Sequence, residues 1–263
     1  MRSGDTATDH TSRSSTHPLS DRAAALRELA LLQKEHRVDS SGRLRAVVLG
    51  ANDGLVSNVS LVMAMAGAVP APGVVLLAGL AGLVAGAISM AVGEYVSVRT
   101  QREQFETLIA FERRELAVDP EHEAHEITVI YRAKGIPRAD AERLAAHLML
   151  EPDVVIDLMA REELGLNPDE LGSPFGVAIS SFLAFAAGAA VPVVPFTVLP
   201  VEAAAPAAAA LTIIALLATG GYTARMTGKS VVRGALRLAA LGGSAAIITH
   251  LAGRAVGGIA PLP

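Results

Sequence analysis

Between residues 97 and 173 the sequence holds side chains that suit a divalent cation. Three pairs of oxygen or sulfur ligands occur there at helical spacing: Glu112 with Glu115, Glu123 with Glu126, and Met159 with Glu163. Residues three or four apart share one face of a helix, so each pair can present two ligands to a common centre. Carboxylates with a thioether suit Fe²⁺ or Mn²⁺, and His122 and His125 could add imidazole. The alternative is that these pairs are the solvated faces of exposed helices.

A second candidate lies inside an apolar stretch. "AVVLGANDGLVSNVSLVMAMAGAV" runs from Ala46 to Val69 and is long enough to cross a membrane, yet it carries Asn52, Asp53 and Asn58. A charged residue at the middle of a span costs about 3 kcal/mol on insertion scales, and such residues usually face a pathway. We therefore predict that Asp53 faces a transport path. The alternative is a structural hydrogen bond between helices.

Two further polar positions accompany Asp53 in the next apolar segment. Met90 and Glu94 are four residues apart and share one face of a helix. Met90 is also open to a packing role, and Glu94 is expected near the cytoplasmic mouth, where a lone carboxylate costs little. His250 and Arg254 lie in the last apolar segment, where interhelical bonding or snorkelling is expected rather than transport.

The composition indicates a membrane protein without thiolate chemistry. Hydrophobic residues make up 51% of the 263 residues, and the mean hydropathy is +0.43. That balance is too apolar for a typical soluble domain and fits several membrane spans. Cys is absent, which excludes a disulfide framework and a thiolate metal site.

Five apolar segments approach or reach the length of a membrane span. They cover about 46–69, 73–96, 174–196, 204–224 and 234–259. They are rich in Gly and Ala, which let membrane helices approach closely. Within the second segment we expect a tight packing face made of four glycines: Gly79, Gly82, Gly86 and Gly93. With no strand pattern elsewhere, the fold class is all-α with five transmembrane helices.

Basic residues flank alternate ends of these segments. Arg43 and Arg45 precede the first, the segment 97–173 is highly charged, and the connection 225–237 carries four basic residues. The connections after the first and third segments have almost no charge. By the positive-inside rule, the amino terminus, segment 97–173 and the 225–237 loop are predicted to be cytoplasmic. The carboxyl terminus then lies on the far side.

This pattern divides the chain into four parts. Residues 1–40 are expected to be a disordered tail with a short amphipathic helix at Ala23–Glu35, 41–98 the first two spans, 99–172 a cytoplasmic helical insertion, and 173–263 the last three spans. "RTQREQFETLIAFERRELAV" continues the second span without a Gly or Pro, so one long helix should leave the membrane near Arg99. Shorter helices are predicted at about 121–133, 137–150 and 152–164.

Two stretches of this sequence resemble the vacuolar iron transporter family. They are "LRAVVLGANDGLVSNVSLVMAMAGA" and "AISMAVGEYVSVRTQRE", and the resemblance extends over about residues 40–260. It implies five transmembrane helices, a dimer, and a cytoplasmic helical metal-binding domain between helices two and three. It also implies export of Fe²⁺ from the cytosol in exchange for protons, and some members of the family carry Mn²⁺.

The resemblance also implies roles for individual residues. The family's transmembrane Asp falls on Asp53 and its translocation-path Met on Met90. We therefore expect a transport path with Asp53 as its metal and proton site, Met90 along it and Glu94 at its cytoplasmic mouth. The family's cytoplasmic metal ligands fall on the three pairs already named: Glu112, Glu115, Glu123, Glu126, Met159 and Glu163. Plant members have a second adjacent Met where this chain has Ala160, a departure that leaves room for water or histidine in the coordination.

The function expected from the sequence is therefore a dimeric divalent-metal/proton antiporter rather than an enzyme. Its partners would be metal ions, protons, the bilayer and a second copy, with no nucleic acid and no prosthetic group. It would reside in the inner membrane of a bacterium or the vacuolar membrane of a eukaryote.

Two alternatives stay open. A membrane-anchored di-iron ferroxidase would use Glu-x-x-His pairs, whereas segment 97–173 offers Glu-x-x-Glu. A metal buffer or sensor would not need Asp53 in a span.

Overall fold

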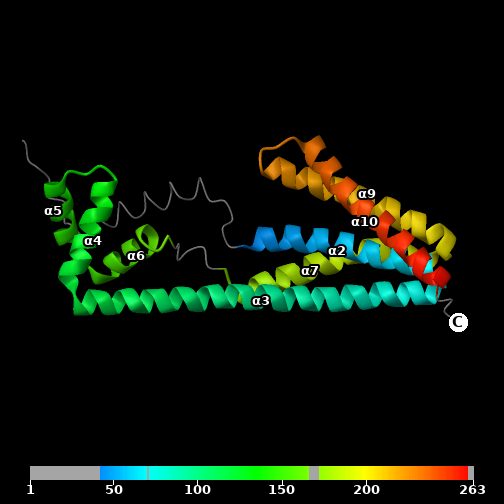
Figure 1. The fold of residues 1–263 in the computed structure, drawn as a ribbon, viewed down its shortest axis with the longest axis horizontal. Helices are drawn as coiled ribbons and strands as arrows, with labels where there is room; N and C mark the ends of the chain where they lie inside the picture. The colour runs from blue at the N-terminus through cyan, green and yellow to red at the C-terminus, as the bar shows by residue number, and fades with distance from the viewer. Residues whose placement is uncertain (1–41, 70, 166–171, 260–263) are drawn as a thin grey trace, which may run out of the picture. The chain divides into compact units, whose positions relative to one another are not determined.

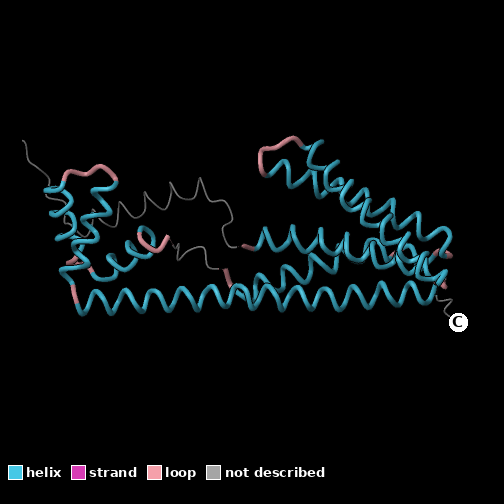
Figure 2. The backbone as a smooth tube through the Cα atoms, viewed as in Figure 1, coloured by secondary structure: helices cyan, strands magenta, loops and turns pink. Residues whose placement is uncertain are grey.

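The computed structural model describes residues 42–69, 71–165 and 172–259. In these ranges every regular element is a helix, and no strand occurs (Figure 2). The expected tail, including the helix at Ala23–Glu35, lies outside the described residues. Nine helices follow one another along the described chain, and five of them are long and apolar enough to cross a membrane.

The five candidate spans agree with the five apolar segments of the sequence. They are α2 (Arg43–Ala68), α3 (Pro72–Val118), α7 (Pro174–Val193), α9 (Val201–Met226) and α10 (Val231–Ile259) (Figure 1). A short helix, α8 (Pro195–Val198), follows α7. Proline is at the first position of α3 and α7, where its missing N–H costs no helical hydrogen bond.

The helix α3 is 47 residues long and has no break, which confirms the prediction of one continuous helix. Three shorter helices follow it: α4 (Pro120–Ala133), α5 (Arg138–Leu148) and α6 (Pro152–Glu162). Asp119 caps α4 by accepting a hydrogen bond from the backbone N–H of His122 at 3.1 Å. Gly135, with a φ of +93°, then turns the chain towards α5.

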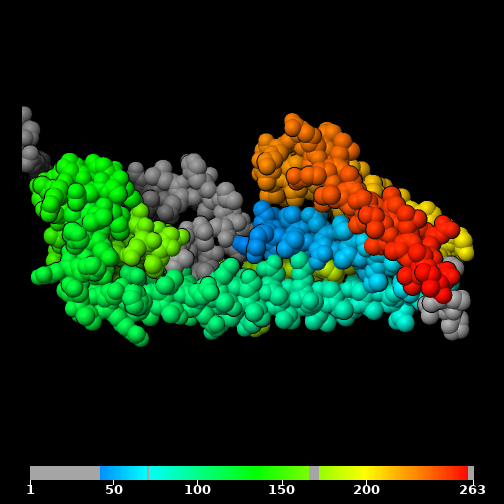
Figure 3. Space-filling view, viewed as in Figure 1, coloured from blue at the N-terminus to red at the C-terminus, as the bar shows by residue number. Residues whose placement is uncertain are grey.

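The helix α2 packs against α7, α3 and α10 (Figures 1 and 3). The pairs α2–α7 and α2–α10 approach each other at glycine residues. A Cβ atom at Gly188 of α7 would collide with the carbonyl oxygen of Ala51 in α2. One at Gly253 of α10 would meet the carbonyl oxygen of Ala64 in the same way. Because lipid supplies no hydrophobic drive between spans, this close backbone contact is how such helices gain packing energy.

The glycine face predicted on α3 is correct for three of its four members. Added Cβ atoms at Gly79, Gly82 and Gly86 would collide with side chains of α2 or α7, whereas Gly93 has open space around it. At about 100° per residue, Gly93 lies between Gly82 and Gly86 around the helix axis, so the difference is not one of helix face.

The helices α3 to α6 form a second, smaller core near the end of α3. Its buried members are Ile127, Ala145, Val155 and Met159, and Leu116 of α3 packs against them. The helices α4 and α6 both contact α3, and α5 contacts both α4 and α6. This core holds the faces of three helices that carry the predicted metal ligands.

Candidate functional site

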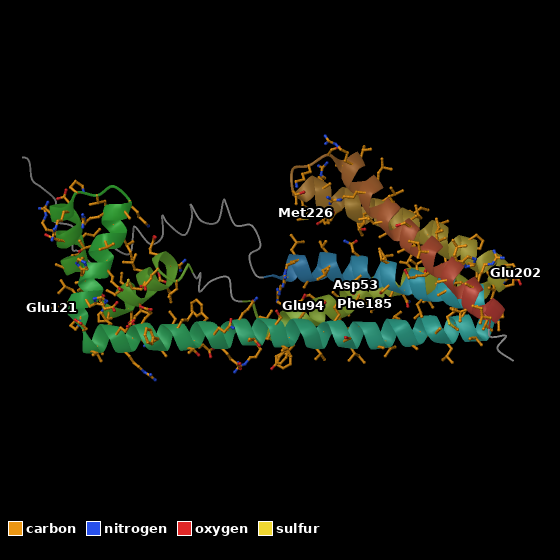
Figure 4. All side chains as sticks on the ribbon, viewed as in Figure 1. Asp53, Glu94, Glu121, Phe185, Glu202 and Met226 are labelled. Atoms are coloured by element: carbon orange, nitrogen blue, oxygen red, sulfur yellow. The ribbon has the colours of Figure 1, made fainter. Side chains whose placement is uncertain are left out.

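A pocket of about 390 Å³ opens between three of the candidate spans. Its walls come from α2 (Asp53, Ser57, Asn58, Leu61), α3 (Gly82, Gly86, Ser89, Met90) and α7 (Phe185). Asp53, Glu94 and Phe185 are labelled in Figure 4. The structure thus brings Asp53 and Met90, two of the three predicted transport-path residues, to one pocket. Asp53 is the one ionisable residue among its lining.

The carboxylate of Asp53 has no ion-pair partner among the described residues. Its side chain is exposed in the single chain, while its backbone carbonyl accepts a hydrogen bond from the hydroxyl of Ser57. Met90 is half-buried and packs against the cluster of Ala87, Phe185 and Ala189. The pocket therefore offers a carboxylate and a thioether, which are one hard and one soft ligand for a divalent cation.

Asn58 is the pocket residue that sequence reasoning did not place in the site. It is 2% exposed, and its Nδ2 donates hydrogen bonds to the carbonyl oxygens of Gly79 at 3.2 Å and Ala189 at 2.7 Å. Its Oδ1 is buried without a hydrogen-bond partner. The signal was present in the sequence, because an amide inside an apolar span must find partners or serve a ligand.

Glu94 lies one turn of α3 beyond Met90 and outside the lining of the pocket. The expectation that it is a lone carboxylate is wrong: its Oε2 lies 3.6 Å from a guanidinium nitrogen of Arg45 in α2. Glu94 is 8% exposed, whereas the Arg45 side chain is 66% exposed. A carboxylate this deeply buried needs a cation beside it, and the first turn of α2 supplies one.

Acidic residues of α3 and α4, and Glu163 directly after the end of α6, lie within one another's electrostatic field. Glu112 and Glu123 are buried, at 3% and 1% exposure, and Glu163 is exposed. Burial, together with the charges of Glu163, Glu123, Glu115 and Glu126, raises the pKa of Glu112 to about 7. Burial followed by neighbouring carboxylates also raises the pKa values of Glu123 and Glu163, which His122 partly opposes. We call these five carboxylates the acidic cluster.

The acidic cluster is not a closed coordination shell. Among the described residues, no three His, Asp or Glu side chains are close enough to form a ready metal site. Oε2 of Glu123 is buried without a hydrogen-bond partner. Carboxylates that carry like charges repel one another, so they converge closely only when a cation or a proton is shared between them.

The two histidines and the methionine predicted near the acidic cluster have different surroundings. Nε2 of His122 lies 3.2 Å from Oε1 of Glu126, so this histidine belongs with the cluster. His125 instead lines a groove between α4 and α5 with Arg132. Met159 is completely buried in the core of α3 to α6, where it packs as an apolar side chain, and its role as a ligand stays a prediction.

Two other polar features lie away from these sites. Nδ1 of His250 in α10 lies 3.0 Å from the carbonyl oxygen of Met63 in α2, which confirms the expected interhelical bond. A larger groove, of about 630 Å³, lies where α9 turns into α10 and is lined by Lys229, Arg233 and Arg237. Its positive charge repels dications, so it is not a candidate for the metal path.

Comparison with known proteins decides the family. The model of the VIT family matches residues 44–254, which is most of the chain. The chain belongs to the VIT family. It is 35% identical to a vacuolar iron transporter of Acanthamoeba castellanii over 211 residues, covering 80% of this chain and 77% of that protein.

Two plant proteins are similar over a comparable length. Identity to vacuolar iron transporter 1 of Arabidopsis thaliana is 29% over 200 residues, covering 76% of this chain and 80% of the relative. Identity to vacuolar iron transporter homolog 1 of Oryza sativa subsp. japonica is 34% over 208 residues, covering 79% of this chain and 71% of that protein. Both the pocket and the acidic cluster of this VIT-family chain lie within the matched range. With its five candidate spans, it is a multi-pass integral membrane protein.

Proposed function

We propose that this VIT-family protein exports a divalent metal, Fe²⁺ with Mn²⁺ as a second substrate, from the cytosol in exchange for protons. The observation that carries the proposal is the pocket between α2, α3 and α7, where Asp53 and Met90 meet inside candidate membrane spans. The relatives named vacuolar iron transporters support a metal as the cargo. A carboxylate and a thioether are a suitable pair for Fe²⁺.

Proton exchange follows from the chemistry of the ligands. A carboxylate binds a dication in its deprotonated form, so metal and proton compete for the same oxygen atoms. In the pocket that competition falls on Asp53. In the acidic cluster it falls on Glu112, whose pKa of about 7 lies in the range where cytosolic metal would displace a proton. We assign the cluster to metal capture and the pocket to passage.

A homodimer is part of the proposal because Asp53 is exposed in the single chain. A carboxylate that faces hydrocarbon near the centre of a span costs about 3 kcal/mol. A second copy placed over the same face would shield the carboxylate and turn the open pocket into an enclosed path around a shared axis. This arrangement would also bring two copies of Asp53 to one path, which balances the charge of a dication.

The test is metal uptake by the purified full-length protein in proteoliposomes under an imposed pH gradient. Fe²⁺, Mn²⁺, Co²⁺ and Zn²⁺ are compared, and a pH-sensitive dye reports proton movement. We expect gradient-driven uptake that is fastest with Fe²⁺ or Mn²⁺, with protons moving in the opposite direction. Uptake with no proton counter-movement would refute the antiport mechanism, and absence of uptake for every metal would refute transport itself.

A further inference from the structure

The side-chain amide of Asn58, in α2, hydrogen-bonds to α3 and α7, and its oxygen has no hydrogen-bond partner in the described part of the chain. Its Nδ2 donates to the carbonyl oxygen of Gly79 in α3 and to that of Ala189 in α7, at 3.2 and 2.7 Å. These two acceptors fix the orientation of the amide. The opposite orientation would place Oδ1 against two carbonyl oxygens, and oxygen cannot donate to either of them. Oδ1 is therefore the atom that these two hydrogen bonds leave without a partner.

That oxygen is buried and has no hydrogen-bond partner among the described residues. Buried polar atoms are nearly always paired, so an orphan of this kind needs a reason. Its surroundings supply one, because Asn58 lines the same pocket as Asp53 and Met90. Space beside the oxygen is kept by Gly82, where an added Cβ atom would lie 2.6 Å from Oδ1.

We propose that the amide oxygen of Asn58 is a ligand for the transported cation and completes a three-ligand site with the carboxylate of Asp53 and the thioether of Met90. This inference rests on the proposed transport function. Bound metal would satisfy the orphaned oxygen, and the two backbone acceptors on α3 and α7 would hold the ligand in place. Such pre-orientation of a ligand by outer hydrogen bonds is usual around metal sites.

An amide oxygen has two consequences that a second carboxylate would not have. It is neutral and does not titrate, so it adds a ligand without adding a competing proton, and proton exchange stays with Asp53. It is also a hard ligand, whereas the sulfur of Met90 is soft. Asn58 therefore favours Mn²⁺ and Fe²⁺, and Met90 alone would favour a softer ion such as Cd²⁺.

The test compares Asn58→Leu with Asn52→Leu in the full-length protein, using uptake of Mn²⁺, Fe²⁺ and Cd²⁺. Asn52 is a matched control because its Oδ1 is also buried without a partner on α2, but it does not line the pocket. We expect Asn58→Leu to raise KM for Mn²⁺ and Fe²⁺ by at least about tenfold, the effect of losing a metal contact. The KM for Cd²⁺ should change much less, and Asn52→Leu should not alter the order of the three metals.

A purely structural role for Asn58 predicts an equal loss for all three metals, and that result, or no loss, would overturn the inference. If Asn58→Leu does not fold, Gly82→Ala gives a second test, since the added methyl crowds Oδ1 of Asn58, together with the side chain of Leu61, while the amide itself is kept. Its expected effect is the same shift away from Mn²⁺. An unchanged metal order in folded Gly82→Ala would count against the ligand role.

Failure of the transport proposal is distinguishable from failure of this one. Should the parent carry no metal, equilibrium binding of Mn²⁺ and Cd²⁺ is measured on the full chain with the acidic cluster disabled by Glu112→Gln and Glu123→Gln. Asn58→Leu in that background should weaken Mn²⁺ binding more than Cd²⁺ binding. Equal Mn²⁺ affinity with and without Asn58→Leu would reject the ligand role, whatever the transport result.

Discussion

The pocket and the acidic cluster are both places where a dication could bind, but they are built in opposite ways. The pocket has one carboxylate, Asp53, among neutral side chains on tightly packed helices. The acidic cluster has five carboxylates, on α3, on α4 and directly after α6, and two of them, Glu112 and Glu123, are buried. One charge with neutral ligands suits a site that must release its ion, whereas many charges suit a site that collects it.

The difference also separates their responses to pH. In the acidic cluster, burial and mutual repulsion raise carboxyl pKa values, so protons compete with metal near neutral pH. In the pocket, the helices are fixed by glycine contacts and by the amide of Asn58 rather than by charge. The two regions should therefore fail differently when single residues are changed.

The largest effect is expected from Asp53→Asn. A neutral amide neither exchanges a proton nor balances a dication, so proton-coupled metal uptake should be abolished while the protein stays folded.

The double variant Glu112→Gln with Glu123→Gln should weaken uptake at low metal concentration but leave it measurable, because the pocket is intact. Uptake into proteoliposomes measures both.

Glu202→Gln is the control for these variants, because Glu202 is an exposed carboxylate at the start of α9 outside both regions (Figure 4). It should transport like the parent. Near-normal uptake by Asp53→Asn, or complete loss of uptake in the double variant, would contradict the assignment of metal capture to the acidic cluster and of passage to the pocket.

A smaller effect is expected from pH on the acidic cluster. The pKa of Glu112 is about 7 in the fold against an ordinary value of 4.5, so folding favours its protonated form. Stability from this group is thus fully present below pH 4.5 and is lost as pH rises through 7. Without metal, protection of α3 to α6 from hydrogen exchange should fall over that window, and Glu112→Gln should flatten the fall.

Metal should reverse this trend, because it binds the deprotonated carboxylates and offsets their repulsion. Affinity of the full chain for Mn²⁺ should therefore decrease as pH drops from about 7 to 5. The double variant Glu103→Gln with Glu106→Gln changes two exposed carboxylates of α3 outside the cluster and should leave that dependence unaltered. Equal losses of Mn²⁺ affinity in this variant and in the double variant at Glu112 and Glu123 would mean that the cluster is an ordinary solvated helix face and not a metal site.

The least perturbing test asks whether the two regions are placed as the charge pattern predicts. Glu121 in α4 and Glu202 in α9 are both exposed, and the chain has no Cys, so Glu121→Cys and Glu202→Cys are clean labelling sites. By the positive-inside rule, an impermeant thiol reagent should reach Glu121→Cys from the cytoplasmic side and Glu202→Cys from the other. Labelling of both from one side would contradict the predicted topology without affecting the identity of the pocket.

Much of this protein could be predicted from its sequence because its signals are local. Hydropathy over about 20 residues predicted all five candidate spans. The unbroken run through "RTQREQFETLIAFERRELAV" predicted the length of α3. Spacings of three residues predicted which carboxylates share a helix face. Each of these features depends on neighbours within a few turns of one helix, and the sequence contains those neighbours.

Other features depend on which helices meet, and only the tertiary structure decided them. The sequence predicted Glu94 to be a lone carboxylate, whereas in the structure α2 places Arg45 beside it. His122 and His125 look equivalent in sequence, yet His122 lies beside Glu126 whereas His125 lines a groove between α4 and α5. The amide of Asn58 takes its orientation from backbone oxygens 21 and 131 residues away. Hydrogen bonds and ion pairs act over a few ångströms in space, so the partners of a polar side chain are known only once the helices are packed.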